Sequence, residues 1–190
     1  MTQMDSVSRI LSVPIGHAKI WSLSWICAVL LTTSGFQYDG QWKRFTPAEG
    51  RFAVLMPGTP SHQRSTTESL HGKIVEHSYG LSTKSGLLEV VFADYPFVPA
   101  AKIELPNNRD QFVKDTKTKV ASEWSINYRG DPGMEFRCEN TDSIFIVRLY
   151  VVGPTVYEIA AGGYRKQIDF DEINRFLNSF QLVDTANGSW

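Results

Sequence analysis

The feature that most constrains the fold is a series of short runs in which large apolar residues alternate with other residues. Such runs cover residues 52–56, 73–81 and 87–95. Side chains of a strand point alternately to its two faces, so a period of two residues predicts β-strands. Prolines close several runs, as at Pro57 and Pro154, because proline cannot donate a ladder hydrogen bond. The pattern predicts a mostly antiparallel sheet of about 6–8 strands.

Two hairpins are predicted from these runs. Residues 73–81 and 87–95 flank a polar turn, and residues 144–152 and 156–161 flank a Gly-Pro turn. The run at 144–152 is almost wholly apolar, as in a strand that is covered on both faces. Its polar exception is Arg148, which we expect to pair with a carboxylate such as Glu158 on the neighbouring strand. Contact with a bound anion is the alternative.

Two segments change to a helical period. In the later one, Asp169 can cap a helix and Glu172 follows three residues later, as in a capping box. In the earlier one, Asn107 or Asn108 can serve as the cap. The apolar stripes comprise Phe112, Val113, Thr116, Val120 and Trp124 in the first helix and Phe170, Ile173, Phe176, Leu177 and Phe180 in the second. Together, sheet and helices predict an α+β fold with two helices packed on the sheet.

The first 35 residues have the layout of an export signal. Arg9 and Lys19 precede an apolar block at residues 20–31, and small residues follow it. A bilayer-spanning helix needs about 20 apolar residues, so residues 20–36 could instead persist as a membrane anchor. Either way, we expect an exported protein, in the periplasm or on the outer side of the inner membrane. Cys27 lies in the middle of the apolar block, which argues against a lipidation site.

The predicted divisions of the chain follow from this layout. Residues 1–35 are a signal peptide or N-terminal membrane anchor, and residues 36–41 are a linker. Residues 42–183 form a single α+β domain, and residues 184–190 form a flexible tail. We expect Cys138, the one cysteine after residue 35, to be a buried and inert thiol. The alternatives are an intermolecular bridge or a nucleophile.

The charge balance limits the kinds of partner. Removal of Arg9, Lys19 and Asp5 with the signal leaves 17 basic and 19 acidic residues. This near-neutral balance, without a basic run, argues against nucleic acid as a partner. It also argues against strong binding to an anionic membrane surface.

Two stretches resemble a group of uncharacterised exported bacterial proteins. The first begins at Trp42 and Phe45 and continues through residues 47–60, Pro-Ala-Glu-Gly-Arg-Phe-Ala-Val-Leu-Met-Pro-Gly-Thr-Pro. The second comprises residues 148–153, Tyr157 and residues 176–180. The order of elements is also similar to the PsbP/Mog1/DcrB-like superfamily. That similarity implies an α/β/α sandwich that serves as an extrinsic subunit, adaptor or envelope protein rather than as an enzyme.

No catalytic, cofactor-binding or metal-binding motif is recognised, and no cofactor is predicted. No serine lies in a G-x-S-x-G turn, and no glycine-rich phosphate loop is complete. On one strand, His71 and His77 would lie about 20 Å apart, too far to share a zinc ion. His62 would approach them only through a strand pairing that the sequence does not reveal. Glu76 and Asp94 could face each other across a hairpin as an acid/base pair, although exposed charges are the simpler interpretation.

Aromatic residues are the remaining candidates for a binding site. Trp124, Tyr150 and Tyr157, with Arg148, could line a groove between sheet and helix that suits a peptide or small apolar ligand. Packing in the core is the alternative for most of them. The leading hypothesis is a non-enzymatic exported or membrane-tethered module that binds an envelope protein or assembly. The alternatives are a domain that binds a small ligand or lipid in the aromatic groove, and an enzyme without a recognisable motif. The sequence makes no prediction of oligomeric state.

Overall fold

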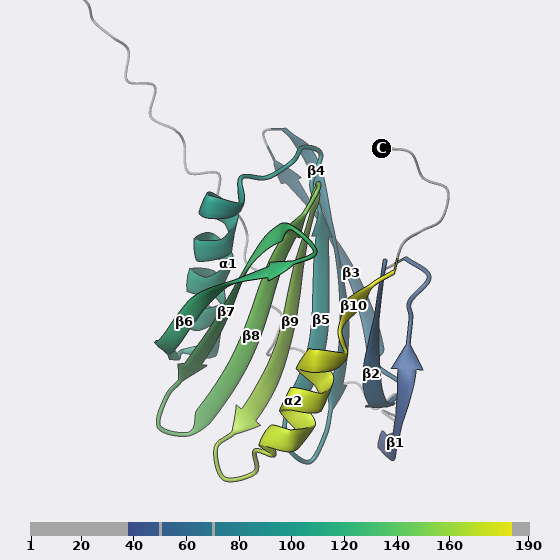
Figure 1. Ribbon diagram of the computed structural model, residues 1–190, viewed down its shortest axis with the longest axis vertical. Coiled ribbons are helices and arrows are strands. Elements are labelled where there is room, and N and C mark those ends of the chain that lie inside the picture. The colour runs from purple at the N-terminus through teal and green to yellow at the C-terminus, as the bar shows by residue number, and fades with distance from the viewer. Residues whose placement is uncertain (1–37, 50, 70, 184–190) are drawn as a thin grey trace, which may run out of the picture.

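The computed structural model describes residues 38–49, 51–69 and 71–183. These residues form ten strands and two helices (Figure 1). In chain order they are β1 (Tyr38–Phe45), β2 (Phe52–Gly58), β3 (Ser61–Ser69), β4 (Gly72–Ser82), β5 (Leu87–Asp94), α1 (Ala101–Thr116), β6 (Lys119–Tyr128), β7 (Asp131–Glu139), β8 (Ser143–Val152), β9 (Thr155–Tyr164), α2 (Phe170–Ser179) and β10 (Gln181–Leu182).

Seven strands form one antiparallel sheet, in the order β3-β4-β5-β9-β8-β7-β6. The chain enters through β3, β4 and β5 and crosses to the opposite edge by way of α1. It then returns through β6, β7 and β8 until β9 pairs with β5. Both predicted hairpins are present, as β4–β5 and β8–β9. β1, β2 and β10 form a second, small antiparallel sheet.

The large sheet is covered on both faces. On one face α1 packs against β7 and β8, and on the other α2 packs against β2 and β9. Figure 1 shows the two helices on opposite sides of the sheet, with the small sheet beside α2. The structure confirms the predicted α+β class and its arrangement as an α/β/α sandwich.

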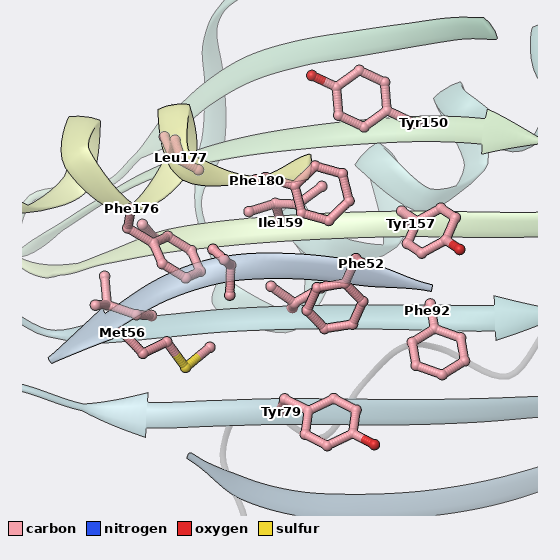
Figure 2. Close-up of a cluster of buried hydrophobic side chains, with 14 of the residues drawn as sticks. Phe52, Met56, Tyr79, Phe92, Tyr150, Tyr157, Ile159, Phe176, Leu177 and Phe180 are labelled. Carbon is pink, nitrogen blue, oxygen red and sulfur yellow. The ribbon is translucent and has the colours of Figure 1, made fainter. Parts of the chain in front are cut away.

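The core on the α2 side is mainly aromatic (Figure 2). Phe180, directly after α2, is 6% exposed, and its ring stacks at 6.0 Å on Tyr150 and at 5.7 Å on Phe52. Burial of a large apolar side chain stabilises the fold by about 1.5–3 kcal/mol. The labelled members of this cluster are Phe52, Met56, Tyr79, Phe92, Tyr150, Tyr157, Ile159, Phe176, Leu177 and Phe180.

The predicted cap and stripe of α2 are largely confirmed. The Asp169 side chain accepts hydrogen bonds from the backbone amides of Asp171 and Glu172, at 2.9 and 3.3 Å. Four of the five predicted stripe residues are buried. The exception is Phe170, which is 41% exposed and lies 6.0 Å from the guanidinium of Arg137.

A second apolar cluster lies between α1 and the sheet. Phe112 of α1 is 2% exposed and meets Phe136 of β7 edge-on at 5.8 Å. Cys138, on the same strand, is fully buried, as predicted. Burial raises the pKa of its thiol to about 11, so little of the reactive thiolate forms near neutral pH.

The start of α1 was predicted too late. The helix begins at Ala101, before the expected caps Asn107 and Asn108, and it includes Pro106. Asn108 lies inside the helix, where its side-chain amide donates to the Glu104 carbonyl at 2.8 Å. Proline is poorly tolerated inside helices, so a helix that begins only after Pro106 is the local expectation, and the tertiary structure overrides that preference.

The end of α1 was predicted too far along the chain. Lys117 has φ 53° and ψ 38°, the left-handed conformation in which many helices end. Val120 and Trp124 therefore lie on β6. Their helical spacing from Phe112 is a coincidence. No glycine or proline lies between residues 112 and 124 to signal the end of the helix.

The described residues begin inside the predicted linker. β1 starts at Tyr38, which pairs with Gly58 of β2, so residues 38–41 belong to the small sheet. No described helix is long and apolar enough to cross a membrane. The predicted signal or anchor at 1–35 and the predicted tail at 184–190 lie outside the described residues.

Candidate functional site

The four residues predicted to line a groove lie on one face of the large sheet. Strand register places Trp124 opposite Glu135, and Glu135 opposite Arg148. In the adjacent row, Tyr150 lies opposite Tyr157. Directly paired residues project from the same face of a sheet, so the four residues share the α2 side of β6, β8 and β9.

Tyr150 and Tyr157 are part of the core. They are 7% and 2% exposed, and the ring of Phe180 lies 6.0 and 5.9 Å from theirs. Burial raises the pKa of Tyr157 to about 12. The chain itself fills this end of the predicted groove, and ligand binding there stays a prediction.

Arg148 joins the sheet to the end of α2. Its Nε donates to Glu135 at 2.6 Å, and its terminal nitrogens donate to the Leu177 carbonyl at 2.8 Å and to the Asn178 side chain at 2.9 Å. A cation at a helix C-terminus satisfies carbonyls that lack partners within the helix. The predicted pairing with Glu158 is wrong, because Arg148 lies opposite Ile159 and Glu158 projects from the other face.

Trp124 marks the most exposed strand of the large sheet. β6 forms an edge of that sheet, and β7 is its one partner among the described strands. Residues 119–125 are all exposed, and Trp124 keeps 47% of its surface in solvent. Figure 1 shows β6 at the edge far from β3. Unpaired backbone groups beside a large exposed aromatic make this edge able to receive another chain.

The two faces of β6 differ. On the α1 side, Glu123 forms an ion pair with Arg109 of α1, which also contacts Asp110. On the α2 side, Trp124 is followed by Ile126, which is half-buried. Because α2 packs on β2 and β9, we take the α2 side of β6, together with its free edge, as the candidate interaction surface. We call it the β6 surface.

A histidine pair lies at the opposite end of the same face. Pairing of β3 with β4 sets His62 against Tyr79 and Arg64 against His77. His62 Nε2 and His77 Nδ1 are 3.0 Å apart, so one ring donates a hydrogen bond to the other. Burial, assisted by His62 and Arg64, lowers the pKa of His77. Sequence reasoning missed this pair because it depends on the strand pairing that the sequence did not reveal.

A tyrosine ties the loop after β1 to the same region. The Tyr79 hydroxyl donates to Glu49 at 2.8 Å, and this hydrogen bond lowers the pKa of the Glu49 carboxyl. Burial raises the pKa of Tyr79 in turn. Among the residues that the structure describes, no three His, Cys, Asp or Glu side chains are arranged to hold a metal ion.

The predicted acid/base pair of Glu76 and Asp94 is not formed. Register sets Glu76 against Ala93 and Val75 against Asp94, so the two carboxylates project from opposite faces. On the α2 side, Asp94 accepts hydrogen bonds from Arg51 at 2.7 Å and from the Thr155 hydroxyl at 2.6 Å.

Comparison with known proteins bears on the fold. No family model and no curated protein matches the chain. The solution structure of cyanobacterial PsbP (CyanoP) from Synechocystis sp. PCC 6803 is similar, with a TM-score of 0.51 and 9% identity, over 80% of this chain and 98% of that chain. The chain has a PsbP-like fold.

A second solved structure is more distant. It is a protein of unknown function from Pseudomonas aeruginosa, PA94, described as a putative regulator, with a TM-score of 0.35 and 11% identity over 70% of this chain and 90% of that chain. At 9% identity, the likeness to CyanoP is one of fold alone, and function has to be argued from the sites.

Proposed function

We propose that this protein is a non-enzymatic module, exported or tethered to the membrane, that binds a protein of the cell envelope through the β6 surface. The observation that carries the proposal is the exposed edge strand β6 with Trp124 at 47% exposure. An extended partner segment can add to such an edge through backbone hydrogen bonds, while pockets or anchors for side chains give specificity.

The other features of the chain agree with this role. The N-terminal 35 residues have the layout of an export signal or anchor. The one described thiol, Cys138, is buried with a raised pKa. A PsbP-like fold adds an architecture that the resemblance associates with adaptors and extrinsic subunits.

Binding of a small ligand or lipid in the aromatic groove has less support. Tyr150 and Tyr157 are occupied by core contacts with Phe180. Arg148 is engaged by Glu135 and by the end of α2. A ligand would thus have Trp124 as its one exposed contact among the four predicted residues.

The test is site-specific crosslinking in the native envelope. A photoreactive phenylalanine analogue replaces Ser122 on β6 in the full chain, and the control replaces Glu68, an exposed residue on the α2 side of β3, at the other edge of the sheet. We expect one stoichiometric crosslinked protein from position 122 and none from position 68. The Trp124→Ala variant should weaken that complex at least tenfold, because aromatic anchors dominate interface energetics.

Tyr164→Ala is the control for loss of an exposed aromatic, since Tyr164 is 66% exposed away from β6. It should leave the complex unchanged. Equal crosslinking from both edges, or a complex that tolerates Trp124→Ala, would exclude the β6 surface. Absence of any partner would argue against the module itself.

A further inference from the structure

Three glutamates from three adjacent strands gather on the α1 side of the large sheet. Val91 of β5 lies between Ser78 of β4 and Glu158 of β9 in the same row. Glu76 and Glu89 lie two residues from Ser78 and Val91 on their strands, so they project from the same face. The three carboxylates thus surround Val91, and we call them the glutamate cluster.

Two members of the cluster are buried without sufficient hydrogen bonds. Glu158 is 2% exposed and Glu89 is 7% exposed. No described group donates to either carboxylate oxygen of Glu158 or to Oε2 of Glu89. The one bond is from the Ser78 hydroxyl to Glu89 Oε1, at 2.5 Å. A buried carboxylate without donors is strongly unfavourable when ionised.

The described part of the chain supplies no cation to the glutamate cluster. The ion pairs among the described residues involve other acidic side chains. α1 adds a further carboxylate instead, because Asp115 is close enough to raise the pKa of Glu158. The negative charge therefore calls for either protons or a positive group from outside these residues.

We propose that the glutamate cluster is a binding site for a guanidinium or ammonium group, supplied by a basic side chain of a partner protein. A small metal ion does not fit, since no three acidic, His or Cys side chains in the described residues converge on one point. A guanidinium is planar and carries five N–H donors, so it can serve carboxylates that are spread over three strands.

The cluster reaches the surface on the β3 side. Glu76 and Ser78 are half-buried, and their β3 neighbours, Ser65 and Gln63, are exposed. A long basic side chain that enters there meets Glu76 first and Glu89 and Glu158 further in. Its aliphatic stem can lie along apolar surface while its charged end meets the carboxylates.

Binding at this site depends on pH. Burial, with Glu89 nearby, raises the pKa of Glu76 to about 7. Burial also raises the pKa of Glu89, and burial with the neighbouring carboxylates Glu89, Glu76 and Asp115 raises that of Glu158. A bound cation favours the ionised forms, so affinity should rise from pH 5 to pH 8.

The experiment uses arginine amide as the probe on the full chain in detergent. The melting temperature is followed against probe concentration at pH 5 and pH 8. Citrulline amide, which has nearly the same shape without the charge, is the control ligand. We expect a saturable increase at pH 8 with arginine amide, at least tenfold weaker binding at pH 5, and no increase with citrulline amide.

Variants locate the site and keep the test independent of folding. Glu158→Gln and Glu89→Gln each remove a buried charge, so both variants should fold. Each should weaken the binding of arginine amide at least tenfold. Glu68→Gln, an exposed position on β3, should bind as wild type. A peptide with one arginine in uncharged sequence should bind at least tenfold more tightly than arginine amide. Equal affinity would assign the site to a small free cation and overturn the protein source.

Two results would overturn the site altogether. One is the absence of a saturable shift at pH 8, which would mean that the cluster is held protonated and serves packing. The other is an equal shift in Glu158→Gln and wild type, which would place the probe elsewhere.

Discussion

Replacement of Phe180 by alanine tests whether the aromatic cluster joins α2 to the sheet. Phe180 is 6% exposed, stacks on Phe52 and Tyr150, and meets Tyr128 and Tyr157 edge-on at 6.3 and 5.9 Å. Loss of the ring removes about 1.5–3 kcal/mol of stabilising free energy that comes from its burial, and it leaves a cavity among four rings. Buried Phe→Ala changes cost about 3–5 kcal/mol, and we expect about 4 kcal/mol here.

The assay is urea unfolding followed by tryptophan fluorescence, with thermal unfolding as a second readout. At about 2–4 °C per kcal/mol for a domain of this size, the melting temperature should fall by roughly 10 °C. Phe170→Ala is the matched control, because Phe170 is the first residue of α2, is also a phenylalanine of the predicted stripe, and is 41% exposed. It should cost less than about 1 kcal/mol. A loss below 1 kcal/mol for Phe180→Ala, or equal losses for both variants, would refute the reasoning.

Further predictions concern charge and backbone. The pKa of Glu76 in the folded state, about 7, exceeds its ordinary value of 4.5. The protonated side chain therefore contributes to the free energy of unfolding fully below pH 4.5, and this contribution is lost as pH rises through 7. In a pH series of urea titrations, the free energy of unfolding of the wild type should decline over this range by up to about 3 kcal/mol, and Glu76→Gln should remove that decline. An unchanged decline would contradict the reasoning. The pKa of His77 is lowered, so its contribution is present above pH 6.5 and lost at lower pH. In the same series, His77→Phe should reduce the loss of unfolding free energy at low pH. A larger loss at low pH in the variant would show that the pKa of His77 is raised in the folded state. Arg148→Met leaves two half-buried acceptors, the Glu135 carboxylate and the Leu177 carbonyl, without this donor and should cost about 2 kcal/mol in urea unfolding, whereas no loss would show that the contacts are not needed. A Cβ at Gly133 would lie 2.6 Å from the Leu149 carbonyl oxygen, so Gly133→Ala should cost about 1–3 kcal/mol by thermal unfolding, and a neutral result would refute that steric argument.

Local patterns were sufficient for most of the sheet. The runs at 73–81 and 87–95 predicted the β4–β5 hairpin because alternation and a polar turn are properties of adjacent residues. The α2 cap at Asp169 was predicted for the same reason. The end of α1 at Lys117 was not, since a left-handed lysine leaves no mark in composition.

The sites show where local reasoning stops. Arg148 was assigned to Glu158 from proximity on neighbouring strands, yet the pleat directs the two side chains to opposite faces. Glu76 was matched with Asp94 for the same reason, and a shift of one residue in register separates them. His62 and His77 come together only through pairing of β3 with β4.

Sequence alone determined most of the strand-forming segments, the capped second helix and the single cysteine after residue 35. Each of these depends on residues that are near one another in the chain. Tertiary structure alone decided strand order, which left β6 at an edge with Trp124 exposed, and strand register, which gathered Glu76, Glu89 and Glu158 on one buried face. The physical reason is that these sites consist of residues from different strands, and only pairing across the sheet sets which faces and neighbours they share.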